Sequence, residues 1–150
     1  MPAQSKQFTG TLELKADRDN FYPFIVFIES FISETGINAE DKNKILLVAE
    51  EILVNIISYA YKEQPGTIKT EILCEENLIT MRFIDGGVPF NALEAPHPDT
   101  SLPLEERGIG GYGILIVKTI MDSIGYKYSG GKNHLTITKN FSHSLNSSVN

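Results

Sequence analysis

The chain has 150 residues, of which 41% are hydrophobic and 21% are charged. This composition is typical of globular proteins, and the length suits a single domain with a real core, so general disorder is excluded. The formal net charge of −6 at pH 7 argues against direct nucleic-acid binding, which needs a basic patch.

The chain has one cysteine, Cys74, which excludes a disulfide framework or a cysteine metal cluster within one chain. The first ten residues lack the apolar core of a signal peptide. No apolar run approaches the roughly 18 residues that indicate a membrane span. We therefore expect a cytoplasmic protein with no membrane partner.

The first predicted elements are a strand and a helix. Residues 7–15 alternate between apolar and polar side chains, as a half-buried strand does. Residues 18–34 are apolar and rich in aromatic side chains, which favours a helix that ends at Gly36.

A second helix and a hairpin follow. Asn38 or Asp41 is a suitable N-cap for a helix that runs to about Lys62, before the Pro-Gly pair at 65–66. Strands are predicted near 67–75 and 78–84, joined by a tight turn.

Residues 86–109 are rich in proline and glycine and read as a long loop. A loop of this length in a compact domain is usually functional or disordered. Helical periodicity returns at about 111–122, and two short strands close the domain near 125–129 and 133–139. We expect residues 141–150 to form a polar tail.

This order of elements predicts an α+β two-layer sandwich, with a mixed, mostly antiparallel sheet and helices on one of its faces. Strands and helices do not alternate regularly, as a parallel doubly wound sheet requires. The whole chain, residues 1–150, is expected to be one domain with its core at about 7–140.

The second helix carries the first candidate site. Most of its circumference is apolar, but Glu51, Asn55, Ser58 and Lys62 share one narrow strip. Glu51 and Asn55 are one turn apart and point the same way. A carboxylate on a largely buried helix needs a partner or a task, although the strip also fits an ordinary solvated face.

The second candidate is Asp85-Gly86-Gly87, which ends an apolar strand. Glycines allow the backbone to turn sharply, and a carboxylate there can accept a hydrogen bond from an exocyclic amine such as that of adenine. The alternative is a common Asp-Gly turn.

The third candidate is the segment 107–113, Arg-Gly-Ile-Gly-Gly-Tyr-Gly, which leads into a helix. Backbone N–H groups at a helix N-terminus bind anions, and Arg107 or Lys118 can add positive charge. A flexible hinge is the alternative. A dinucleotide fingerprint is excluded because a proline-rich loop precedes the glycines, and a P-loop because no Gly-Lys-Ser/Thr follows.

In their order and spacing, these three motifs resemble those of the GHKL ATPases. The small size and the segments EEILVNIISYAY, DGGVPFN and GIGGYGILIVKTIMD are most similar to the anti-sigma factor serine kinases of the RsbW and SpoIIAB type. The resemblance covers roughly residues 7–140. It implies the Bergerat fold, with ATP and Mg²⁺ held beneath a mobile lid.

The resemblance also implies partners and roles. Such a kinase binds a sigma factor and phosphorylates an anti-anti-sigma protein of the STAS class on serine, and relatives often form homodimers. Glu51 is implied either as the general base or as the group that orients the nucleophile, Asn55 as the Mg²⁺ ligand and Asp85 as the adenine-recognising group. The implied nucleotide-binding residues are Asn55, Asp85, Gly87, Arg107, Gly108, Gly110, Gly111 and Gly113.

Two positions depart from the family pattern. Tyr59 stands where many relatives carry histidine, and Arg107 lies earlier than the lid arginine of the sporulation-type enzymes. These departures leave open a nucleotide-gated regulator without useful turnover, or a degenerate domain that serves only for assembly. For His97, His134 and His143 we expect structural roles, because nothing groups them into a metal site.

Overall fold

The computed structural model describes residues 7–61, 64–90 and 111–144, and for 111–114 it describes the backbone only. The strands are β1 (Gln7–Lys15), β2 (Thr67–Glu75), β3 (Leu78–Asp85), β4 (Ser123–Ser129) and β5 (Lys132–Asn140). The helices are the short 3₁₀ helix η1 (Arg18–Asn20) and the α-helices α1 (Phe21–Ser33), α2 (Ala39–Tyr59) and α3 (Gly111–Ile120).

The strands form one sheet in the order β1-β2-β3-β5-β4. Neighbouring strands are antiparallel at every pairing in the described part of the chain. Gly130 and Gly131 both have positive φ, 63° and 75°, as the tight turn between β4 and β5 requires. In this register Asp85, the last residue of β3, lies opposite Ile68 on β2 and Asn133 on β5.

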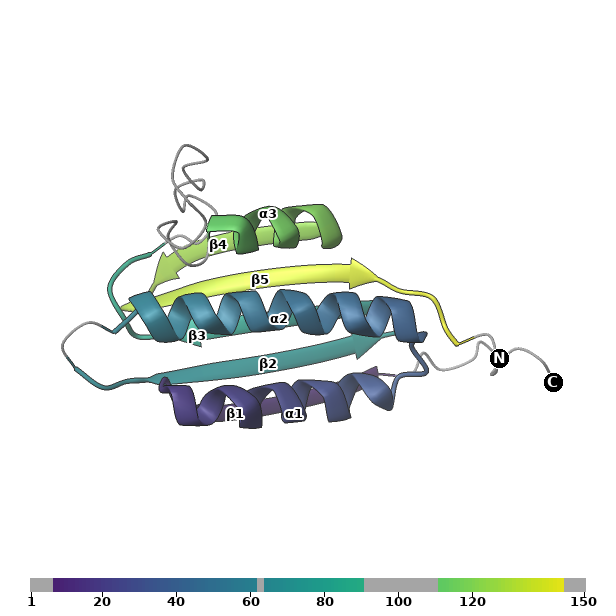
Figure 1. Ribbon diagram of the computed structural model, residues 1–150, viewed down its shortest axis with the longest axis horizontal. Coiled ribbons are helices and arrows are strands. Elements are labelled where there is room, and N and C mark those ends of the chain that lie inside the picture. The colour runs from purple at the N-terminus through teal and green to yellow at the C-terminus, as the bar shows by residue number, and fades with distance from the viewer. Residues whose placement is uncertain (1–6, 62–63, 91–110, 145–150) are drawn as a thin grey trace, which may run out of the picture.

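All three α-helices cover the same face of the sheet (Figure 1). Buried and less buried residues alternate along β2, β3 and β5, because successive side chains of a strand point to opposite faces. The helix-facing side chains pack with those of α1 and α2 into one apolar core; among the fully buried are Phe24, Ile28, Ile45, Leu53, Ile72, Met81, Phe83 and Ile137. The predicted two-layer α+β sandwich is confirmed.

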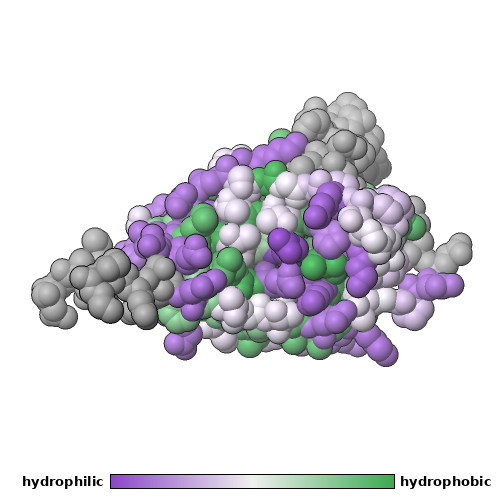
Figure 2. Space-filling model, turned by 180° about the vertical axis from the view of Figure 1, so that it is seen from behind, coloured by the Kyte–Doolittle hydropathy of each residue, from purple (hydrophilic) through white to green (hydrophobic). Residues whose placement is uncertain are grey.

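The described elements leave the other face of the sheet uncovered. Figure 2 shows this face, where hydrophilic side chains surround smaller apolar areas. Glu71, on β2, forms salt bridges with Lys69 and Arg82, each at 3.5 Å. Exposed pairs of this kind contribute little to stability, typically below about 1 kcal/mol.

Local hydrogen bonds set the helix boundaries. The Asn38 side chain accepts from the Asp41 N–H at 2.8 Å, so Asn38 is the N-cap of α2 and Asp41 lies in its first turn. The helix ends at Tyr59 rather than near Lys62. The Ala60 carbonyl accepts from the Val88 N–H at 2.9 Å. At the end of α2, a hydrogen bond to a segment distant in sequence therefore replaces the next helical hydrogen bond.

The segment 141–144 is held against the loop between α1 and α2, although the sequence places it in the tail. Ser142 accepts from the Asn38 N–H at 2.9 Å, and its own N–H donates to Asp41 Oδ2 at 2.9 Å. Ser144 N–H donates to the Gly36 carbonyl at 2.8 Å. The ordered chain therefore extends past residue 140; residues 145–150 lie outside the described part.

No helix of the described residues is long and apolar enough to cross a membrane.

Candidate active site

The topology brings the elements that carry the three candidate motifs to one end of the molecule. The C-terminal half of α2, the end of β3 and the start of α3 lie at the same end of the sheet (Figure 1). Helices α2 and α3 also pack against each other. Because β3 and β5 are antiparallel, the first residues of β5 lie beside Asp85. The motifs are far apart in sequence, yet the fold places the elements that carry them together.

Asn55 lies in the buried part of α2, with 2% of its surface exposed. Its Oδ1 atom is buried and has no hydrogen-bond partner among the described residues. An unpaired buried carbonyl oxygen costs about 1–3 kcal/mol, so a native structure needs a reason to keep one. An amide oxygen suits Mg²⁺, which binds few protein ligands and takes its others from phosphates and water. Asn55 therefore fits the implied metal.

Glu51 lies one turn before Asn55 and is half-buried. Burial raises the pKa of its carboxyl, and the neighbouring charge of Glu50 raises it further. In the part of the chain that the structure describes, no salt bridge includes Glu51. An unpaired carboxylate with a raised pKa is a suitable proton acceptor.

Asp85 is buried, with 5% of its surface exposed. Its Oδ1 atom accepts from the Gly87 N–H and from Asn133 Nδ2, each at 2.9 Å. Burial raises the pKa of Asp85, while these two hydrogen bonds and the nearby His134 oppose that rise. Oδ2 takes no part in the hydrogen bonds of the described residues, so it is the oxygen that can accept from a ligand.

Gly87 lies where the Asp85 turn meets the end of α2. A Cβ atom at Gly87 would come within 2.2 Å of the Ala60 carbonyl oxygen. The Val88 N–H donates to that same oxygen at 2.9 Å. Close packing against α2 therefore requires glycine here, in addition to any need for a base to approach.

Tyr61 holds the same turn from the other side. Its hydroxyl accepts from the Gly86 N–H at 2.7 Å and donates to the Thr67 carbonyl at 2.6 Å. Its ring lies so close to Gly66 that a Cβ there would come within 1.9 Å of it. One side chain thus joins the end of α2, the start of β2 and the turn after β3.

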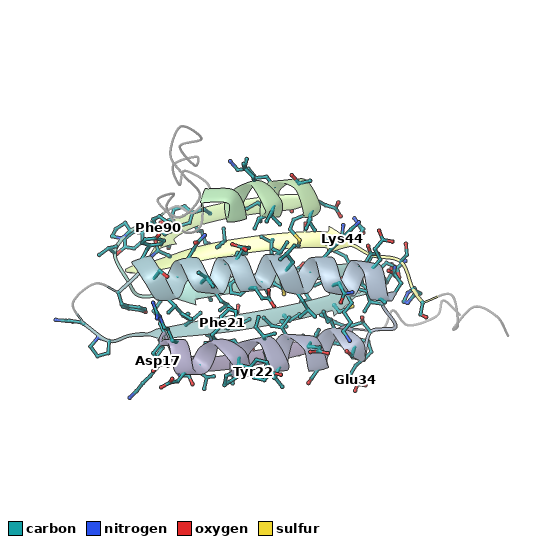
Figure 3. The ribbon with its side chains drawn as sticks, in the orientation of Figure 1. Asp17, Phe21, Tyr22, Glu34, Lys44 and Phe90 are labelled. Atoms are coloured by element: carbon teal, nitrogen blue, oxygen red, sulfur yellow. The ribbon has the colours of Figure 1, made fainter. Side chains whose placement is uncertain are left out.

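Tyr59 lies one turn beyond Asn55 on α2 and packs against Phe90, with ring centroids 6.1 Å apart. Figure 3 shows Phe90 beside the C-terminal end of α2. The tyrosine at this position therefore supports the segment that follows the Asp85 turn.

The glycine-rich motif is described only in part. Gly111 and Gly113 lie in the first turn of α3, where backbone N–H groups are free of helical partners and favour an anion. Arg107, Gly108 and Gly110 lie outside the described residues. Lys118 lies in the last turn of α3, roughly two turns from that end, so the structure gives no support to a phosphate contact by Lys118.

Comparisons with known proteins agree with this arrangement. The family described as histidine kinase-like ATPase domain matches residues 14–139. The chain belongs to this family. The predicted likeness to the GHKL ATPases and, within them, to the RsbW-type serine kinases is therefore confirmed.

Several proteins similar to this chain carry the names of serine or serine/threonine protein kinases. It is 26% identical over 131 residues to the serine/threonine-protein kinase BtrW of Bordetella bronchiseptica, covering 87% of this chain and 92% of that protein. It is 26% identical over 126 residues to the serine-protein kinase RsbW of Listeria monocytogenes, covering 81% and 80%. With RsbW of Bacillus cereus the identity is 30% over 104 residues, covering 66% and 64%.

A solved structure shares the fold. The crystal structure of the RsbU and RsbW domains of Rv1364c from Mycobacterium tuberculosis matches with a TM-score of 0.63 and 14% identity. The match covers 91% of this chain but 32% of that longer one. At this identity the likeness concerns the fold alone.

The two described histidines, His134 and His143, make separate contacts. His134 Nε2 lies 3.3 Å from the Ser129 carbonyl oxygen, and His143 Nε2 lies 2.6 Å from Asn77 Oδ1. The two contacts fit the structural roles expected of them. His97 lies outside the described residues.

Sequence reasoning missed Asn133 and Tyr61. Both act through contacts between segments distant in sequence, and neither belongs to a recognisable motif. For Asn133 one signal was present. Asparagine is unfavourable within a strand, and Asn133 lies near the start of a predicted strand, so it needs a hydrogen-bond partner there. For Tyr61 the sequence offered no comparable signal.

Proposed function

We propose that this chain is an ATP-dependent serine/threonine protein kinase that phosphorylates an anti-anti-sigma protein of the STAS class and also binds a sigma factor. The observation that carries the proposal is the pair on α2. The buried, unpartnered oxygen of Asn55 lies one helical turn from Glu51, a carboxylate with a raised pKa. The names of the kinase relatives support the same activity.

Nucleotide binding begins at Asp85. Its Oδ2 accepts a hydrogen bond from the exocyclic amine of adenine, while Oδ1 keeps its two hydrogen bonds within the protein. The N-terminal turn of α3, with Gly111 and Gly113, presents backbone N–H groups to the phosphates. Asn55 supplies its amide oxygen to Mg²⁺, which when bound neutralises phosphate charge.

Transfer then requires an acceptor hydroxyl that loses its proton. Glu51 accepts the proton of the partner's serine as the oxygen attacks the γ-phosphoryl group. A raised pKa makes this carboxylate a stronger base than an ordinary exposed glutamate. For phosphoryl transfer, the remaining task of the protein is to position the reactants and to neutralise their charge.

The test has two stages. Calorimetric titration of the wild type with ATP and Mg²⁺ is expected to show binding, and Asp85→Asn is expected to weaken it, because a donor then faces the amine of adenine. Radiolabelled ATP is next supplied with a STAS-domain protein, and phosphoserine is expected on that protein. Glu51→Gln should abolish transfer while binding persists, whereas Glu50→Gln, its neighbour off the strip, should retain transfer.

Other outcomes would indicate a different function. ATP binding without phosphoserine on any STAS partner, but with nucleotide-dependent binding of a sigma factor, would identify a nucleotide-gated regulator. Tyr59 in place of the usual histidine is the feature that favours this second function. No binding of ATP or ADP by the wild type would refute both.

A further inference from the structure

Asn133, at the start of β5, uses its whole side chain in hydrogen bonds. It is 4% exposed. Its Nδ2 donates to Asp85 Oδ1 at 2.9 Å and to the Val88 carbonyl at 2.8 Å. Its Oδ1 accepts from the Phe90 N–H at 2.9 Å and from the Tyr126 hydroxyl at 2.5 Å. A side-chain amide has two donor hydrogens and two acceptor positions, and each of the four is used.

These partners fix the orientation of the amide. Rotation by 180° would place the NH₂ group against a backbone N–H and the amide oxygen against a carboxylate and a carbonyl. Three of the four hydrogen bonds would then be replaced by repulsive contacts, and only the Tyr126 hydroxyl, which can also accept, could keep a hydrogen bond. Asn133 therefore presents donors to Asp85 in one way only.

The consequence for Asp85 is an asymmetric carboxylate. Two donors, from Gly87 and Asn133, converge on Oδ1, and the other oxygen is left for a ligand. The same amide also holds the carbonyl of Val88 and the N–H of Phe90. The residues that follow the Asp85 turn are thus held by the side chain that orients its carboxylate.

We propose that Asn133 is a positioning residue for nucleotide recognition. Its amide nitrogen orients Asp85, and its amide nitrogen and oxygen together hold the segment 88–90. This inference rests on the proposed function, because it assigns Asp85 Oδ2 to the amine of adenine. Asn133 acts through Asp85 and need not touch the nucleotide.

The isosteric change Asn133→Asp separates this role from a merely structural one. It keeps the oxygen that accepts from Phe90 and Tyr126, but it replaces the donor to Asp85 with a second carboxylate. Two carboxylates at hydrogen-bond distance share one proton, which raises the apparent pKa of the pair. A shared proton restores the missing donor, so nucleotide binding should recover at acidic pH.

The measurement is the Kd for ATP with Mg²⁺ by calorimetry at several pH values between 8 and 5.5. It is expressed relative to the wild type at each pH, so that titration of the nucleotide cancels. At pH 8, Asn133→Asp is expected to weaken binding about 10- to 100-fold, as loss of a hydrogen bond to a buried charged group does. The ratio should fall toward one as the pH falls.

Three control variants keep the result specific. Tyr126→Phe removes a bond from the acceptor side only, so its effect should be small and independent of pH. Histidine changes charge between pH 5 and 8, so the series is repeated with His134→Gln, which should leave the recovery in place. Should Asn133→Asp not fold, Asn133→Ser removes Nδ2 without adding charge and should weaken ATP and ADP alike, by about 10-fold.

In the described part of the chain, the charged and titratable groups near Asp85 also include the Tyr61 hydroxyl and the side chains Glu13, Lys69 and Lys132, which line one cleft of about 300 Å³ with it. None of them is changed in the series. Wild-type-like ATP binding by Asn133→Asp at pH 8, or a loss that stays constant down to pH 5.5, would overturn the inference while leaving the kinase proposal intact. Absence of nucleotide binding by the wild type would overturn both.

Discussion

Replacement of Gly87 by alanine tests how tightly the Asp85 turn is packed against α2. The new Cβ would lie 2.2 Å from the carbonyl oxygen of Ala60, 2.6 Å from its carbonyl carbon and 2.8 Å from its Cβ. Real Cβ atoms essentially never come closer than 3.0 Å to such atoms, so one backbone segment must move by about an ångström. That shift would break or lengthen the 2.9 Å bond from Val88 to Ala60.

The expected loss is about 2–4 kcal/mol in the free energy of unfolding. Overpacking a close contact costs about 1–3 kcal/mol, and the hydrogen bond adds about 1 kcal/mol. The matched control is Gly86→Ala. Its Cβ would meet only the Tyr61 hydroxyl, at 3.6 Å, so we expect a change within about 1 kcal/mol of zero.

Urea unfolding followed by circular dichroism measures both variants, and calorimetry with ATP measures the consequence for binding. We expect Gly87→Ala to bind ATP more weakly even at temperatures where it is fully folded, because Asp85 moves with the turn. Equal stability of the two variants would refute the assigned contact with Ala60. Normal ATP affinity in a destabilised Gly87→Ala would show that the turn does not carry the nucleotide site.

Three further predictions concern stability. Burial acts to raise the pKa of Asp41, but hydrogen bonds from Ser142 and Asn38 and nearby lysine charges lower it overall. Asp41→Asn should therefore cost about 1 kcal/mol at pH 7. In acid titrations of urea unfolding, this difference should shrink as the pH falls from 3.8 through the folded pKa. Burial raises the pKa of Asp85 above 3.8, so its ionisation disfavours the folded state. Asp85→Asn should therefore gain stability relative to the wild type as the pH rises from 3.8 through the folded pKa. A difference in the free energy of unfolding that stays constant over this range would contradict the prediction. Tyr61→Phe should lose about 1 kcal/mol in urea unfolding.

Most of the fold could be predicted because its signals are local. Alternating side chains marked β1, an apolar and aromatic-rich run marked α1, helical periodicity marked α3, and the Gly130-Gly131 pair separated the last two strands. The end of α2 could not be predicted in this way. No helix breaker occurs before Pro65, and the helix ends where Ala60 bonds to Val88, a contact that exists only after β3 has paired.

The same distinction holds for the site. Asp85 and Asn55 could be singled out as candidates because they belong to short motifs of fixed spacing. Asn133 is separated from Asp85 by 48 positions and becomes its neighbour only through the β3–β5 register. The positions of Ser142 and Ser144 likewise could not be predicted, because the groups that hold them lie about a hundred positions earlier, on the loop before α2 and in its first turn.

The two carboxylates of the site show how one environment can support two chemical roles. Burial raises the pKa of both Glu51 and Asp85. At Asp85, donors from Gly87 and Asn133 oppose that rise and favour the ionised form, as an acceptor for adenine requires. At Glu51, the charge of Glu50 adds to the rise and no hydrogen bond opposes it. A proton acceptor must gain a proton readily and a recognition group must not, so the hydrogen-bond donors at Asp85 support the proposed division of roles, with Glu51 as base and Asp85 as recognition group.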